Sequence, residues 1–153
     1  PLPLAILVAL SVGTLAGLFN GIIITRFKVP PLIATLATLA LYRGLAEGIS
    51  QARSIRGYPE WFFILGQGEF FGIPTQLWIV AFFTLLTGFI LTYTTWGRAT
   101  YAIGANETAA RFSGIAVDKT KLFIYAASGF AASLAAIILF LEFQQLVLIW
   151  EWD

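Results

Sequence analysis

The chain has 153 residues, of which 59% are hydrophobic, 16% aromatic and 11% charged. A soluble domain carries about 25% charged residues, and one small core cannot cover so much apolar surface. We therefore expect a membrane protein and exclude an ordinary soluble enzyme. Nine basic against eight acidic residues give a net charge of +1, so we expect no nucleic-acid partner.

Cysteine and histidine are both absent from the sequence. Thiol and histidine catalysis, disulfides and Cys/His metal sites are therefore excluded within the chain, and we expect neither a metal nor a cofactor. The glycine-rich phosphate-binding loop of ATPases is absent as well, so the chain by itself should not hydrolyse ATP. It begins with proline and contains no methionine, which favours a fragment of a longer protein.

Four segments have the length and composition of membrane spans. A transmembrane helix needs about 20 mostly apolar residues, and a lipid bilayer is then its solvent. The segments that meet or nearly meet this requirement are residues 2–25, 32–49, 76–95 and 122–141. The predicted fold class is therefore all-α: a polytopic transmembrane helical bundle in one membrane domain over residues 1–153.

The charged residues of the links between these segments orient the chain. With alternating spans, links 26–31 and 96–121 lie on one side of the membrane, and link 50–75 lies on the other. The first two links contain Arg26, Lys28, Arg98, Arg111, Lys119 and Lys121, whereas the middle link has only Arg53 and Arg56. Because cytoplasmic loops collect lysine and arginine, we expect 26–31 and 96–121 to face the cytoplasm. The aromatic residues of link 50–75 suit either the headgroup zone or packing on their own protein.

Glycines recur every four residues in the first segment, at Gly13, Gly17 and Gly21. They share one helix face, on which another backbone can approach closely. We predict that this face packs against a helix. Asn20, beside Gly21, either bonds across helices or is a polar residue at the membrane interface.

The second segment contains polar residues of two kinds. Arg43 and Glu47 are one helical turn apart and can pair, either along a polar pathway or at the outer end where long side chains reach water. Thr35 and Thr38 either bond helix carbonyls or face a lumen. Together with Asn20 and Arg43, they are the candidate residues of a substrate path.

The middle of link 96–121 is typical of a short helix with a signal at each end. Asn106 is a good N-cap, Glu107 and Arg111 suit the helix dipole, and Gly114 suits the left-handed residue that ends helices. We expect Asp118 to cap the fourth span. A helix of two turns is too short to be stable alone, so it needs either a groove on another protein or its own membrane face.

A series of motifs follows in a fixed order over residues 9–135. They are Gly17-Leu-Phe-Asn20-Gly21, Pro30-Pro-Leu-Ile33-Ala-Thr35, Tyr42-Arg43-Gly44, Gly72-Ile-Pro74, Gly97-Arg98, Tyr101-Ala-Ile-Gly104, Asn106, Ala109-Ala110-Arg111, Ser113-Gly114-Ile115 and Ser128-Gly129. In this order they resemble the ribose-type permeases of sugar ABC importers. Within that family, the sequences of these motifs are most similar to the rhamnose and autoinducer-2 branch.

The resemblance implies a role and partners. Such a permease pairs with a second permease subunit in the bacterial inner membrane, between ATPase subunits and a periplasmic sugar-binding protein. It implies import of a rhamnose-, ribose- or autoinducer-2-like solute by alternating access, with no chemistry on this chain. The short helix would then be the cytoplasmic coupling helix. By carry-over, the residues that contact the ATPase would be Gly104, Asn106, Glu107, Ala109, Ala110, Arg111 and Gly114.

The resemblance also implies that the chain is incomplete. Permeases of this family are longer, so we expect this chain to be the central part of one, and residues 142–153 depart from the family's glycine-rich pattern. The alternative is a small standalone membrane protein that oligomerises through its glycine face into a pore. An intramembrane enzyme lacks a histidine, cysteine or paired-carboxylate site.

Overall fold

In the part of the chain that the structure describes, four helices are long and apolar enough to cross a membrane, as the sequence predicts. The computed structural model describes residues 2–50, 69–70 and 72–150, with the side chains of 3–50 and 72–140. By length and composition, the candidate spans are Pro3–Arg26, Pro31–Ser50, Thr75–Tyr93 and Val117–Phe140. The fold class is therefore all-α, and the predicted number of spans is confirmed. Most aromatic residues of the predicted outer link lie outside the described residues.

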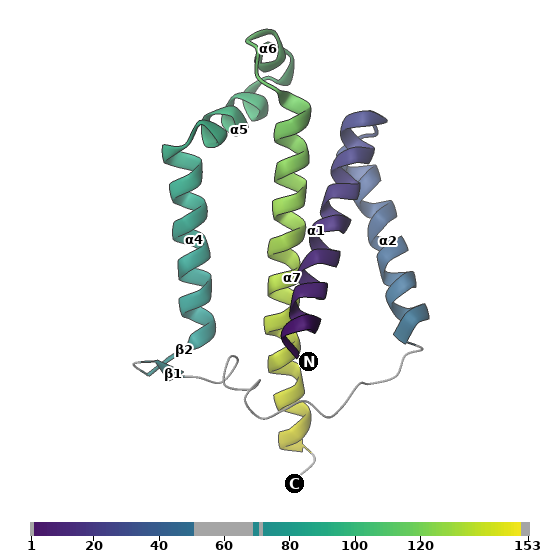
Figure 1. Ribbon diagram of the computed structural model, residues 1–153, viewed down its shortest axis with the longest axis vertical. Helices are drawn as coiled ribbons and strands as arrows, with labels where there is room; N and C mark the ends of the chain where they lie inside the picture. Colours follow the sequence, from purple (N-terminus) through teal and green to yellow (C-terminus); the bar gives the residue numbers. More distant parts are fainter. Residues whose placement is uncertain (1, 51–68, 71, 151–153) are drawn as a thin grey trace. The chain divides into compact units, whose positions relative to one another are not determined.

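The chain divides into two compact units, and the first is built from three helical segments. It contains α1 (Leu2–Arg26), α2 (Pro31–Ser50) and residues 121–133 of α7 (Val117–Trp150). Figure 1 shows the short turn that joins α1 to α2. Lys28 has a φ of 53° in this turn, and Pro31 begins α2 in the first helical position, where its missing N–H costs nothing. The link between the first two spans therefore lies where the sequence predicts it.

Glycines bring the backbones of α1 and α7 together inside this unit. A Cβ atom at Gly17 would overlap the Tyr125 carbonyl oxygen and press on Gly129, and one at Gly13 would overlap the Ser133 side chain. Gly21 lies against Leu122, where a Cβ would be 3.2 Å from Cδ2. The glycine face of α1 therefore lies against α7 of the same chain.

The first described element of the second unit is a very small sheet that the sequence does not predict. Strands β1 (Glu69–Phe70) and β2 (Ile73–Pro74) pair antiparallel over two residues each, and Gly72 has a φ of 72° between them. A left-handed residue favours glycine, so the turn suits this position. The sheet leads directly into α4 (Thr75–Tyr93).

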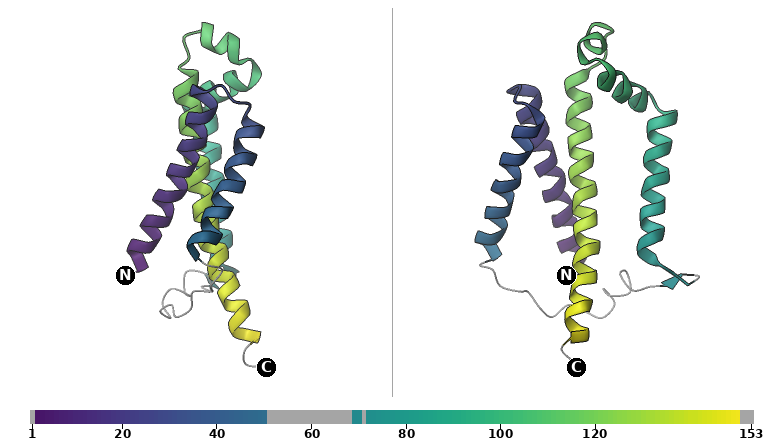
Figure 2. Two further views of the ribbon diagram at one scale, coloured as in Figure 1. Left: turned by 90° about the vertical axis from the view of Figure 1, so that its right-hand side faces the viewer. Right: turned by 180° about the vertical axis from the view of Figure 1, so that it is seen from behind.

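The helices that follow differ from the sequence prediction at their ends. The third span was expected to reach Thr95, but α4 ends at Tyr93 and a separate helix, α5 (Thr95–Ala105), follows. The Thr94 hydroxyl caps α5 by accepting the Gly97 N–H at 3.2 Å. After α6 (Glu107–Phe112), α7 begins at Val117 rather than 122 and continues past 141 to Trp150. Both views of Figure 2 show α7 as one unbroken helix.

Apolar side chains remain largely uncovered on the candidate spans. Among the described residues, the buried apolar ones are Ile24, Ala34, Ala110 and Val117, whereas Leu32 on α2 is 71% exposed and Leu85 on α4 is 74% exposed. Large apolar patches of this kind are stable only against lipid or another protein. The helices satisfy their own backbone hydrogen bonds, which hydrocarbon requires of any spanning segment. Burial therefore supports the membrane assignment made from composition.

Gly17→Ala should destabilise the protein, because the new methyl group overlaps the Tyr125 carbonyl. Overpacking of this kind costs about 1–3 kcal/mol, so we expect a thermal midpoint several degrees lower in detergent. Gly88→Ala on α4 is the matched control, since a Cβ there meets nothing within 4 Å. Equal midpoints for the two variants would contradict the close contact of α1 with α7.

Candidate functional site

Helix α6 is a single short helix whose two ends are both satisfied locally. At its start, Asn106 is extended and its Oδ1 accepts the Ala109 N–H at 3.0 Å, which confirms the predicted N-cap. At its end, the Ile115 N–H bonds the Ala110 carbonyl at 3.1 Å and the Gly114 N–H bonds the Arg111 carbonyl at 3.2 Å. This pair of bonds is the Schellman motif. Gly114 has the φ of 82° that the motif needs, as predicted.

An ion pair ties α6 to the first turn of α7. Arg111 donates two hydrogen bonds to the Asp118 carboxylate, from Nη2 to Oδ1 at 2.8 Å and from Nη1 to Oδ2 at 3.1 Å. Glu107 lies one turn back, with its Oε1 at 3.5 Å from Nη2. Asp118 was expected to cap the fourth span; instead it lies within the first turn of α7 and pairs with Arg111. The prediction failed because α7 begins earlier than expected.

The two-pronged geometry makes this pair more specific than an ordinary surface ion pair. Both side chains are about half exposed, at 52% each, so solvent screening limits its contribution to stability. A planar guanidinium that meets a carboxylate with two parallel bonds fixes orientation as well as distance. Its hydrogen bonds and charge attraction to Asp118 raise the pKa of Arg111 above its usual value, so the guanidinium group stays protonated.

The residues of α6 divide into a buried and an exposed set. Ala110 is only 4% exposed, so its methyl group packs within this chain. Phe112 is 88% exposed at the end of the helix, and Ala109 is also exposed. Gly104, near the end of α5, has open space where a side chain would be. An almost fully exposed phenylalanine costs free energy in water, so this end of α6 is suited to a partner.

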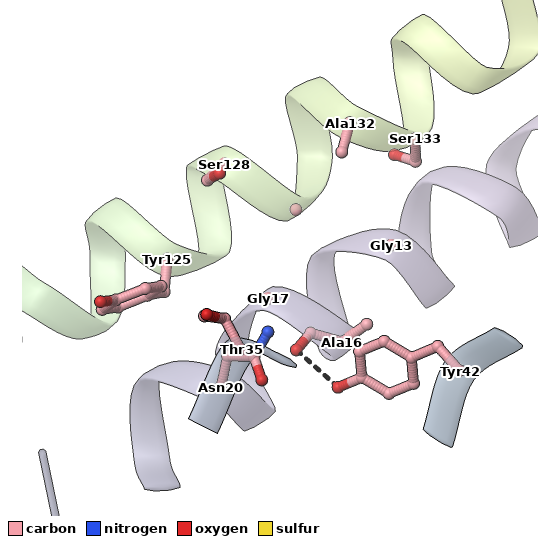
Figure 3. Close-up of a pocket in the computed structure, with 11 residues that line it drawn as sticks. Gly13, Ala16, Gly17, Asn20, Thr35, Tyr42, Tyr125, Ser128, Ala132 and Ser133 are labelled. Atoms are coloured by element: carbon pink, nitrogen blue, oxygen red, sulfur yellow. Dashed lines mark hydrogen bonds between the residues drawn. The ribbon is translucent and has the colours of Figure 1, made fainter. Parts of the chain in front are cut away.

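A second feature of the molecule is a pocket of about 330 Å³ inside the first unit, between α1, α2 and residues 121–133 of α7. Small residues form part of its wall, and polar side chains form the rest (Figure 3). The polar ones are Asn20 on α1, Thr35 and Tyr42 on α2, and Tyr125, Ser128 and Ser133 on α7. Its volume is at the small end of the range of about 300–1,000 Å³ that is typical of ligand sites.

Asn20 stands out among the residues that line this pocket. Its Oδ1 is buried and accepts no hydrogen bond from any described residue. A buried polar atom without a partner costs about 1–3 kcal/mol, so proteins rarely retain one without a reason. Within the described residues, Oδ1 accepts no hydrogen bond from another helix, which was one of the two roles expected of Asn20.

The structure brings together only part of the predicted substrate path. Asn20 and Thr35 line the pocket, whereas Thr38 and Arg43 do not. Thr38 is 4% exposed and donates to the Ala34 carbonyl at 3.0 Å, so it follows the helix-bonding alternative. Arg43 pairs with Glu47 at 3.1 Å, and both side chains are well exposed. The expected ion pair is confirmed, and its exposure fits the outer end of a span.

Sequence reasoning missed several residues of both features. Tyr42 donates from its hydroxyl to the Ala16 carbonyl at 3.0 Å, across from α2 to α1. Neither this contact nor the pocket positions of Tyr125 and Ser128 follows from spacing within one helix. Phe112 could have been found, because it is the one aromatic residue in a helix of six residues that is otherwise small or polar.

Comparison with known proteins assigns the chain to one family. The family described as the permease component of the branched-chain amino acid transport system matches residues 1–149. No solved structure matches the chain.

Curated relatives that match are permeases named for different solutes. The L-arabinose transport system permease protein AraH of Escherichia coli K12 is 42% identical over 78% of this chain and 37% of its own length. The ribose import permease protein RbsC of Haemophilus influenzae is 40% identical over 90% of this chain and 44% of its own. The autoinducer 2 import system permease protein LsrC of Klebsiella pneumoniae is 37% identical over 84% of this chain and 37% of its own length. This chain therefore spans less than half the length of these relatives.

Asn106→Ala should loosen the first turn of α6, because the Ala109 N–H loses its acceptor. Loss of such a cap costs about 1 kcal/mol, which corresponds to about fivefold faster amide hydrogen exchange across α6. Thr108→Ala, an exposed change in the same turn outside the cap, is the control. Exchange rates that are unchanged in Asn106→Ala would contradict the capped helix.

Proposed function

Because the chain belongs to the family of branched-chain amino acid transport system permease components, we propose that it forms the central part of the permease of a bacterial ABC importer, with α6 as its coupling helix. As a member of this family, the chain is a multi-pass protein of the inner membrane and a non-catalytic component. ATP hydrolysis then belongs to a partner ATPase, and α6 is the element that receives its movement.

The observation that carries this proposal is the construction of α6. A helix of six residues does not form stably by itself, yet α6 has a complete N-cap, a complete Schellman motif and a two-pronged ion pair to α7. These interactions hold the short helix in place while Phe112 remains 88% exposed. Aromatic side chains that become buried at the centre of an interface contribute much of its binding energy. A short helix that is held in place and has an exposed aromatic residue is suited to binding in a groove on another protein.

The proposed contact with the ATPase includes the residues carried over from the family and adds one. The carried-over residues that are exposed on or beside α6 are Gly104, Asn106, Glu107, Ala109, Arg111 and Gly114. Phe112 joins them as the anchor. Ala110 is buried within this chain, so in this proposal it stabilises the position of α6 and does not contact the ATPase.

The solute is proposed at the level of a class. Relatives are named for L-arabinose, ribose and autoinducer 2, at identities that differ little. We therefore propose a sugar or sugar-like solute, which includes the rhamnose and autoinducer-2 branch that the motifs favour. A second permease subunit, an ATPase and a periplasmic binding protein would complete the importer. Import would follow from ATP-driven shifts between inward-open and outward-open states.

The structure weakens the alternative of a standalone pore built by self-association. That alternative relied on the glycine face of α1 as an oligomerisation surface. Gly13, Gly17 and Gly21 already pack against α7 of the same chain, so this face is occupied.

Phe112→Ala should weaken capture of the ATPase by the permease about tenfold or more, as loss of an interface anchor does. Phe27→Ala is the matched control, because Phe27 is also a well-exposed phenylalanine but lies in the other predicted cytoplasmic link. Both variants should insert into the membrane normally. The measurement is the affinity of each purified permease variant for the purified ATPase. Equal affinities for the two variants would count against α6 as the docking element.

Exchanging the charges of Arg111 and Asp118 tests how the ion pair acts. Arg111→Asp and Asp118→Arg should each reduce ATP-driven transport, because each leaves two like charges facing one another. The double variant should recover part of the transport, since it restores an attractive pair but not the proposed contact of Arg111 with the ATPase. If the double variant is as impaired as Arg111→Asp alone, the ion pair with Asp118 does not contribute to transport.

A further inference from the structure

We propose that the pocket between α1, α2 and α7 is a binding site for a neutral, hydroxyl-rich solute, with Asn20 Oδ1 as its central hydrogen-bond acceptor. This inference rests on the proposed function and adds a place on the chain where the solute would bind. The pocket lies wholly within the first unit of the structure.

The buried side-chain oxygen of Asn20 is the first argument. Arg26 ends α1 and, with a rise of about 1.5 Å per residue, Asn20 lies about 9 Å inside the helix from that end. Its Oδ1 has no partner among the described residues. At this depth the unpaired acceptor is costly, because hydrocarbon offers nothing in place of water. A ligand that donates a hydrogen bond would remove that cost.

The hydrogen bonds of the neighbouring hydroxyls are the second argument. Thr35 Oγ1 donates to the Pro31 carbonyl at 2.8 Å, Tyr42 donates to the Ala16 carbonyl at 3.0 Å, and Ser133 Oγ donates to the Phe130 carbonyl at 2.8 Å. A hydroxyl has one hydrogen and two lone pairs, so each of these oxygens has spent its hydrogen and still accepts. Together with Asn20, they give the pocket four acceptors. A solute with several O–H donors complements such a lining.

Charge is the third argument. None of the described residues that line the pocket is acidic or basic. In a low-dielectric setting, an ammonium or carboxylate group needs a counter-charge, which these side chains do not supply. The pocket therefore disfavours a zwitterionic amino acid, even though the family description names amino acid transport. It favours an uncharged polyol such as a sugar.

The shape of the pocket is compatible with such a solute. Gly13, Gly17 and Gly129 contribute only backbone to its wall, because glycine has no side chain. A Cβ at Gly17 would enter crowded space, so the same glycines that bring α1 to α7 also shape the site. Tyr125 and Ser128 also line the pocket, from α7.

The test is uptake by the complete importer in liposomes, with its ATPase and binding protein present. Radiolabelled D-ribose and L-arabinose serve as polyol probes and L-leucine as the zwitterionic probe. Asn20→Leu keeps the approximate size of the side chain and removes the acceptor. Thr35→Val keeps the shape and removes the hydroxyl. Thr14→Val is the matched control, because Thr14 on α1 donates to the Leu10 carbonyl in the same way but does not line the pocket.

The expected result is about tenfold lower sugar uptake per folded permease in Asn20→Leu, the effect of one lost hydrogen bond to a solute, and a smaller loss in Thr35→Val. Thr14→Val should retain the uptake of the unaltered importer. All three variants should still bind the ATPase, because none touches α6.

Several results would overturn the inference. Unchanged sugar uptake in Asn20→Leu, or an equal loss in Thr14→Val, would show that the pocket does not bind the solute. If Asn20→Leu lowers only the amount of folded permease and leaves the uptake per folded molecule unchanged, Asn20 packs against another helix and does not bind the solute. Uptake of leucine in place of both sugars by the unaltered importer would exclude the polyol class. Failure of the proposed function shows separately, as absence of ATP-driven uptake by the unaltered importer.

Discussion

Helices α1 and α7 meet backbone to backbone, because Gly17 and Gly129 place no side chain between them. In a membrane, apolar surface gains little from moving out of lipid, so helices associate through close packing and hydrogen bonds rather than through the hydrophobic effect. The glycines supply that packing. They also form one side of the pocket. The other residues that line it include an asparagine and several residues with hydroxyl groups. The candidate solute site thus depends on the contact that holds the first unit together.

Helix α7 connects the two features that bear on function. Its first turn contains Asp118, which holds Arg111 of α6, and further along the same helix Gly129 packs against α1. In the proposed function, movement of α6 would be passed to the first turn of α7 through this oriented ion pair. The exposed end of α6, with Phe112, is where that movement would be received.

The sequence predicted the features that follow from spacing within one helix. The glycine repeat, the Asn106 cap and the left-handed Gly114 each depend on residues a few positions apart, and all three are present. The missed features depend on residues that the fold brings together. Tyr42 reaches Ala16 from another helix, and Asp118 reaches Arg111 only because the turn at Gly114 reverses the chain. Helix α5 was missed because Thr94, which caps it, lies inside a run that reads as one continuous span.

The most direct measurement of the central claim is the side of the membrane on which α6 lies. The chain has no cysteine, so Ser113→Cys introduces a single thiol at an exposed position beside α6. A membrane-impermeant maleimide should label this thiol in inside-out vesicles and leave it unlabelled in intact cells whose periplasm is open to the reagent. Labelling in the intact cells would place α6 on the periplasmic side, beyond the reach of any cytoplasmic ATPase, and would contradict the account.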